Sequence, residues 1–84
     1  MLKLLYFAML REDLGIGAEE LALPAGVTTV AGLRAHLVAR GGAWASTLAG
    51  GKALRVAVNQ EMAGPATAVG PGDEVAFFPP VTGG

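Results

Sequence analysis

Cysteine is absent from this sequence of 84 residues, and histidine occurs only once, as His36. Without cysteine the chain has no disulfide bond and no thiolate nucleophile, and it offers no cysteine ligand for zinc or for an iron–sulfur cluster. A single histidine also excludes a metal site built from several histidines. We therefore expect no metal site and no thiol chemistry in this chain.

Charge is also scarce, because only 15% of the residues are Asp, Glu, Lys or Arg and the formal net charge is −1. Nucleic-acid binding draws most of its affinity from neutralised phosphates, so we expect no nucleic-acid partner. No apolar run approaches the roughly 18 residues that cross a bilayer, and no small-residue cleavage site follows the apolar N-terminal stretch. Hydrophobic residues make up 52% of the chain. The composition predicts one folded domain in the cytoplasm, without a membrane partner.

Short apolar segments bounded by turn residues predict five strands. They cover residues 2–9, 19–23, 55–58, 61–63 and 74–78. Between the first two strands, the polar and glycine-rich segment that contains Arg11 predicts a connecting loop. Asn59-Gln60 and Gly72 are typical of tight turns.

The segment of residues 30–40 predicts the main helix. A threonine before it can cap the first turn, and Gly41-Gly42 ends it. Its apolar stripe at helical spacing consists of Val30, Leu33 and Leu37. Residues 43–48 predict a further short helical turn with Trp44 pointing inward. The element order predicts an α+β, β-grasp (ubiquitin-like) fold, with the main helix on one face of a mixed sheet and the first and last strands at its centre. The remaining predicted core residues are Tyr6, Val56, Val58, Val75 and Phe77.

Charged residues mark the outer face of the sheet, which points away from the main helix. The period of two places Phe7 in register with Lys3, and Phe78 in register with Glu74. A contiguous apolar patch is often an interaction site, and a flexible methionine such as Met62 suits such a surface. The alternatives are that a loop covers the two rings and that Met62 fills the core.

The last six residues, Pro79-Pro80-Val81-Thr82-Gly83-Gly84, predict an extended tail of residues 79–84 on a domain of residues 1–78. Two prolines favour a stiff polyproline conformation, and six extended residues reach about 20 Å. Glycines without side chains could enter a narrow channel. The Gly84 carboxylate would be a poor acyl donor at neutral pH, and nothing in this sequence can activate it. Activation must come from another protein, typically by adenylation with ATP.

Three stretches resemble the MoaD family, the small subunits of molybdopterin synthase. They are Tyr6–Glu12, Val58–Glu61 and, above all, Gly72–Gly84. The resemblance covers the whole chain. It implies that a MoeB-like adenylyltransferase uses ATP to adenylate Gly84 and that a sulfurtransferase system then makes the thiocarboxylate. The carrier would donate this sulfur to precursor Z on a MoaE-like large subunit, which holds the catalytic pocket.

On this resemblance the chain binds no cofactor itself and is not an enzyme alone. The reacting residues would be Gly83 and Gly84. The partner-binding residues would be Phe7, Met62, Phe78, Pro79, Pro80, Val81 and Thr82, and Arg11 could form an ion pair with an acidic partner. A thiamin-type sulfur carrier, a ubiquitin-like protein modifier and a plain interaction module remain as alternatives.

Overall fold

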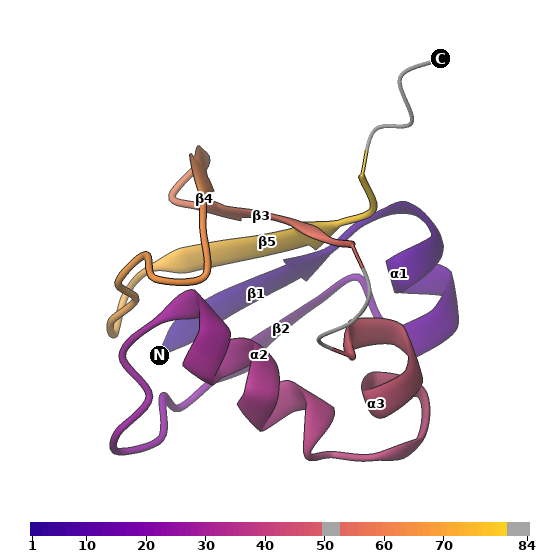
Figure 1. Ribbon diagram of the computed structural model, residues 1–84, viewed down its shortest axis with the longest axis horizontal. Helices are drawn as coiled ribbons and strands as arrows, with labels where there is room; N and C mark the ends of the chain where they lie inside the picture. The colour runs from indigo at the N-terminus through magenta and orange to yellow at the C-terminus, as the bar shows by residue number, and fades with distance from the viewer. Residues whose placement is uncertain (50–52, 81–84) are drawn as a thin grey trace.

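The computed structural model describes residues 1–49 and 53–80 (Figure 1). Its five-stranded sheet has the order β2-β1-β5-β3-β4. The central strands β1 and β5 are parallel, and the other neighbours are antiparallel. This arrangement confirms the predicted α+β, β-grasp architecture. The strands are β1 (Leu2–Tyr6), β2 (Ala18–Leu21), β3 (Arg55–Val58), β4 (Glu61–Ala63) and β5 (Glu74–Phe78), and the helices are α1 (Ala8–Leu14), α2 (Val30–Val38) and α3 (Gly42–Leu48).

Alternate residues of the two central strands form the sheet's contribution to the core. In β5, Val75 and Phe77 are fully buried while Glu74, Ala76 and Phe78 are only partly buried. Helix α2 supplies the opposite side, and its cap is Thr29, whose Oγ1 accepts a hydrogen bond from Gly32 N at 3.2 Å. The predicted core is confirmed, since all of its members are buried: Tyr6, Val30, Leu33, Leu37, Val56, Val58, Val75 and Phe77.

The chain between the first two strands differs from the sequence prediction. The predicted strand 2–9 ends at Tyr6, and the predicted loop around Arg11 is helix α1. Phe7 is still extended, Ala8 then has a φ of 54°, and the turn that follows redirects the chain into the helix. Leu10 is buried and Leu14 packs against the core, one turn apart on one side of α1. This buried pair stabilises the helix against the competing strand pattern.

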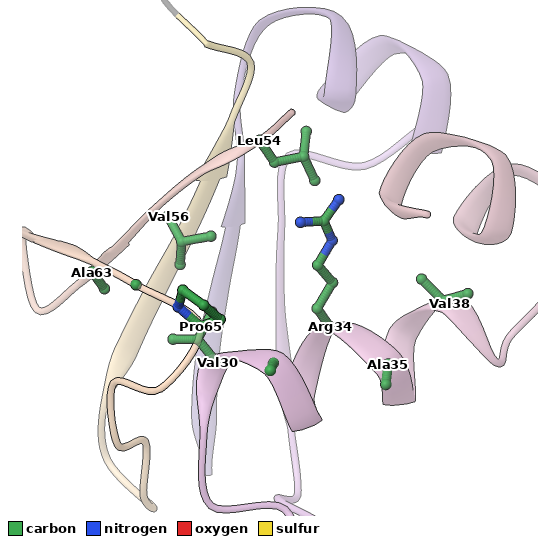
Figure 2. Close-up of a pocket in the computed structure, with 10 residues that line it drawn as sticks. Val30, Arg34, Ala35, Val38, Leu54, Val56, Ala63 and Pro65 are labelled. Atoms are coloured by element: carbon green, nitrogen blue, oxygen red, sulfur yellow. The ribbon is translucent and has the colours of Figure 1, made fainter. Parts of the chain in front are cut away.

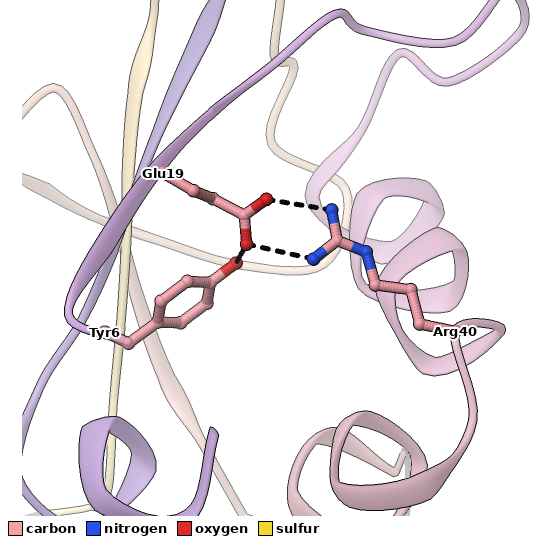
Figure 3. A network of polar contacts seen from close by, with 3 residues as sticks. All are labelled: Tyr6, Glu19 and Arg40. Carbon is pink, nitrogen blue, oxygen red and sulfur yellow. Dashed lines mark hydrogen bonds and ion pairs between the residues drawn. The ribbon is translucent and has the colours of Figure 1, made fainter. Parts of the chain in front are cut away.

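A polar network ties β1 and β2 to the end of α2 (Figure 3). The Tyr6 hydroxyl donates to Glu19 at 3.1 Å, and Arg40 donates two hydrogen bonds of 2.9 Å to the same carboxylate. The Arg40 guanidinium also lies 4.4 Å from the centroid of the Trp44 ring on α3. Trp44 packs against the core, which confirms its predicted inward position. The hydrogen bonds from Arg40 hold the pKa of Glu19 below its usual value, and burial raises the pKa of Tyr6.

Two turns meet at the far end of β5 from the tail. Asn59 and Gln60 both have positive φ, at 50° and 69°, and Gly72 has a φ of 89°. The Asn59 side chain joins the turns, because it donates to Asp73 at 3.0 Å and accepts from the Glu74 amide at 3.0 Å. The prediction that these residues form turns is confirmed. Across residues 1–49 and 53–80, no helix is long and apolar enough to cross a membrane.

Candidate functional site

The outer face of the sheet carries one row of apolar residues that crosses all five strands. The strand registers pair Leu5 with both Ala18 and Ala76, and they pair Ala57 with both Ala76 and Met62. These residues alternate along their strands with core residues, so the row lies on the face that α2 does not cover. Four of its five members are alanine or leucine. The row is therefore an uncharged stretch of the outer face in which Ala57 is itself buried and the terminal methionine is exposed.

Phe7 and Phe78, the two aromatic residues that we expect to bind a partner, lie where β1 and β5 end. Phe7 N donates to Phe77 O at 3.1 Å, which continues the pairing of these strands by one residue. The Phe7 side chain is 46% exposed, whereas Phe78 is partly buried opposite Arg55 of β3. Phe7 therefore forms the more accessible part of this surface.

Met62 on the edge strand β4 is 61% exposed, so it does not fill the core. Its register partner Ala57 connects it to the apolar row. Met62 also lines a cleft of about 250 Å³ together with Arg55 and Pro80. This cleft brings the edge of the sheet next to the beginning of the tail, which are far apart in the sequence.

A charged row limits the apolar surface at its other end. Lys3 pairs in register with Glu20 on one side and with Glu74 on the other. Opposite charges at directly paired positions are favourable in a sheet. The outer face thus changes from paired charges, where β1 begins, to mainly apolar residues and the cation of Arg55, where β5 ends.

The tail leaves the sheet at Pro79, which is partly buried, and continues through Pro80, which is exposed and lines the cleft beside Arg55 and Met62. Proline cannot donate to a strand ladder, so this pair ends β5. The other predicted tail residues lie outside the described residues: Val81, Thr82, Gly83 and Gly84. Among the residues that are described, no three His, Cys, Asp or Glu side chains are grouped to hold a metal ion.

Arg11 lies on α1 instead of in the predicted loop, and its side chain is exposed. The guanidinium end lies over Gly17, where an added Cβ would come within 2.9 Å of Arg11 Nε. Arg11 therefore points toward the start of β2. Helix α1 also exposes Met9, at 57%, which the sequence prediction placed on a strand. The i, i+4 spacing of Leu10 and Leu14 is the signal that could have indicated this helix.

A sheet with β1 and β5 central and parallel, a helix on one face and a chain that leaves the open end of β5 defines a ubiquitin-like β-grasp protein. Within this class the chain belongs to the ThiS family, whose family model matches residues 4–84. The molybdopterin synthase sulfur carrier subunit of Escherichia coli (strain K12) is 49% identical over 84 residues, with 100% of both chains covered. The subunit of the same name in Haemophilus influenzae is 46% identical over 84 residues, again with 100% of both chains covered.

The fold is also similar to that of a crystal structure of the H. volcanii small archaeal modifier protein 1. The two structures superpose with a TM-score of 0.78 at 30% identity, and the match covers 95% of this chain and 97% of that chain. The predicted resemblance to the MoaD family is confirmed by the two sulfur carrier subunits. The similarity to a modifier protein bears on one alternative that the sequence left open, which is a ubiquitin-like protein modifier.

Proposed function

We propose that this protein is the sulfur carrier subunit of a molybdopterin synthase and acts in molybdenum cofactor biosynthesis. The observation that carries the proposal is the full-length similarity to two proteins named for this role. The described surface supports it, because the exposed side chains of Phe7 and Met62 lie near the residues from which the tail begins, and the helix-covered face holds the core. In this proposal the chain provides the surface that its partners bind, and the partners supply the catalytic groups.

The reacting group in this proposal is the carboxylate of Gly84. A carboxylate oxygen attacks the α-phosphorus of ATP on a MoeB-like adenylyltransferase, and pyrophosphate leaves. A sulfur nucleophile at the sulfide oxidation level, supplied by a sulfurtransferase system, then forms a C–S bond as the C–O bond to AMP breaks. The product is a thiocarboxylate on Gly84. Gly83 has no side chain to obstruct a narrow channel.

The charged carrier then docks on a MoaE-like large subunit, whose pocket holds precursor Z and performs the sulfur transfer. Phe7, Met62 and Phe78 contact the partner at the root of the tail. Pro79 and Pro80 direct the chain away from the sheet, and Val81 and Thr82 line the channel. Arg11 offers a charge on α1 to an acidic partner. The carrier binds no cofactor, because ATP is used by its partner, and we place the process in the cytoplasm.

Deletion of Gly84 is the direct test. We expect the truncated protein to fold as the full chain does, since the core residues in the described part of the chain all precede Pro79, but to support no molybdopterin formation with purified partners. Intact mass spectrometry of the full chain from its own cells should show a gain of about 16 Da, which is oxygen replaced by sulfur on a carried group. Normal product formation by the truncated chain would contradict the proposal.

A second candidate function is covalent modification of protein lysines. The observation that favours it is the similarity to the archaeal modifier protein over 95% of this chain. The same activated carboxylate would form an isopeptide bond if an amine attacked it instead of a sulfur nucleophile. Immunoblots of cells that express the tagged chain would then show adducts of higher mass, and these would disappear when Gly84 is deleted. A thiamin-type carrier would instead restore thiamin synthesis in cells that lack their own carrier.

A further inference from the structure

Arg55 is the first residue of β3, and its exposed side chain lies on the outer face opposite Phe78. Within residues 1–49 and 53–80, no hydrogen bond or ion pair engages its guanidinium. Two other arginines differ: Arg40 is bound to Glu19, and Arg34 donates to the carbonyls of Leu48 and Ala49. Arg55 is thus a cation without an internal partner at the root of the tail.

An apolar cleft adjoins this cation. Met62 and Pro80 line the cleft of about 250 Å³ beside Arg55. Its remaining lining consists of Ala53, Leu54, Val56 and Ala63. This cleft is an open depression, so a side chain placed against it would contact the apolar side chains and backbone polar groups of its lining, with a guanidinium at its rim.

The cleft continues beneath α2. A second cleft of about 530 Å³ shares Leu54, Val56 and Ala63 with the first. Figure 2 shows these three side chains on one wall and those of Val30, Arg34, Ala35 and Val38 on the other. The two clefts adjoin along β3 and β4, and we refer to them together as the groove. This groove is continuous with the docking surface proposed above, because both include Met62 and Pro80.

A partner that covers this groove must also remove water from Arg55. Desolvating a cation is costly unless a carboxylate or another acceptor replaces the water. An arginine and a carboxylate can form two parallel hydrogen bonds, which adds geometric specificity. The cation therefore selects for a partner with an acidic group at this point, and the apolar lining selects for a large apolar side chain next to it.

We propose that Arg55 and the adjoining groove recognise a segment of the synthase large subunit that presents a carboxylate next to a large apolar side chain. The inference rests on the proposed function, because it names the chemistry of the partner surface that receives this carrier. The large subunit must pass close to Pro80 to hold the tail, so the groove lies within its reach. Arg55 is then a specificity-determining residue of the docking surface.

The first test compares Arg55→Ala with Lys3→Ala, which removes a cation from the charged end of the same face. We expect Arg55→Ala to weaken binding to the purified large subunit about tenfold in low salt, with a smaller loss of affinity when salt is raised than the unchanged chain shows. Lys3→Ala should change the affinity by less than about twofold, within the range of a cation outside the contact. Equal effects of the two substitutions, or none at Arg55, would overturn the proposal.

A second test locates the partner segment by the site of attachment, with the large subunit at a concentration that saturates the cysteine variants. Because the chain has no cysteine, Arg55→Cys and Lys3→Cys each carry a unique thiol for a photo-crosslinker. We expect the label at position 55 to attach to a large-subunit peptide with an acidic residue within a few positions of Phe, Leu, Ile, Met or Trp. Crosslinking equally from position 3, or to a peptide without an acidic residue, would contradict the inference.

The two proposals fail in different ways. If deletion of Gly84 stops product formation but Arg55→Ala binds the large subunit normally, the sulfur carrier proposal stands and the groove proposal is wrong. If the Gly84 deletion leaves product formation intact, the proposed function itself is wrong. Circular dichroism of Arg55→Ala checks the fold, which should be retained because the side chain is exposed and outside the core.

Discussion

Two regions of the molecule differ in how an arginine is bound. One is the network of Tyr6, Glu19 and Arg40, and the other is the surface around Arg55. Arg40 gives two hydrogen bonds to Glu19 and lies over an aromatic ring, so its interactions are satisfied within the chain. Arg55 lies beside an apolar groove with no partner in the described part of the chain. The network around Arg40 therefore stabilises the fold, whereas the surface around Arg55 is available to another protein.

The largest difference should come from two adjacent phenylalanines on opposite faces of β5. Phe77→Ala removes a fully buried ring that stacks near Tyr6, with the ring centroids 6.1 Å apart, and should cost about 3–5 kcal/mol of unfolding free energy. Phe78→Ala removes a partly buried ring and should cost about 1–2 kcal/mol. Urea denaturation measures both values.

In binding assays with the large subunit, only Phe78→Ala should lower affinity in the fraction of protein that remains folded. Equal losses of stability at the two positions would show that the faces of β5 are not distinct. A large loss of stability at Phe78 with unchanged affinity would assign that ring to the core.

Disruption of the polar network should have an intermediate effect. Arg40→Ala removes a bidentate ion pair and the contact with Trp44, and we expect a loss of about 1–2 kcal/mol after allowing for partial solvent exposure. A double-mutant cycle with Glu19→Gln should show a coupling energy of about 1 kcal/mol. Affinity for the large subunit should stay unchanged, and a loss comparable to that of Arg55→Ala would remove the distinction between the two regions.

The network should also make the free energy of unfolding depend on pH in the acidic range. The folded pKa of Glu19 lies below its unfolded value, so its contribution is present above the ordinary glutamate pKa and is lost as the pH falls through the folded pKa. We expect the unfolding free energy of the unchanged chain to decrease in this acidic range. Glu19→Gln should flatten that part of the profile, measured by urea denaturation at a series of pH values.

The smallest effect on stability should come from Met62→Ala. Its side chain is 61% exposed, so we expect a change below about 0.5 kcal/mol in the unfolding free energy. Affinity for the large subunit should nevertheless fall about threefold, because the side chain closes one side of the groove. Met9→Ala on α1 is the matched control, with a similarly exposed methionine outside the groove, and it should leave the affinity unchanged.

The sequence predicted most of the sheet because its strands have clear signals. The predicted bounds of β3, β4 and β5 match the structure, since turn residues such as Asn59 and Gly72 separate these strands. The first strand was predicted three residues too long. The apolar run continues without a break from Leu4 through Leu10, so the run itself does not mark where the strand ends, and only the spacing of Leu10 and Leu14 indicates the helix.

The period of two predicted which side chains are exposed on the outer face, but the sequence did not predict that α1 follows Phe7. Phe7 is exposed as expected, although it lies at the cap of α1 and not within a strand. Arg11 was expected in a loop and lies on that helix. The groove could not be predicted, because its part beside Arg55 depends on where Pro80 lies relative to β3 and β4, and its larger part depends on how far α2 lies from these strands.

The sequence alone determined the order of the five strands and of α2 and α3, the apolar core stripe and the family, because these depend on residue identities and on spacing along the chain. It did not show α1. Only the tertiary structure decided that Ala18, Leu5, Ala76, Ala57 and Met62 form one row, since that depends on strand order and register. The tertiary structure likewise decided that Arg40 binds the carboxylate of Glu19, which is 21 positions away in the chain, while Arg55 binds no carboxylate in the described residues. Pairing across such distances in the chain follows from packing, which no local pattern encodes.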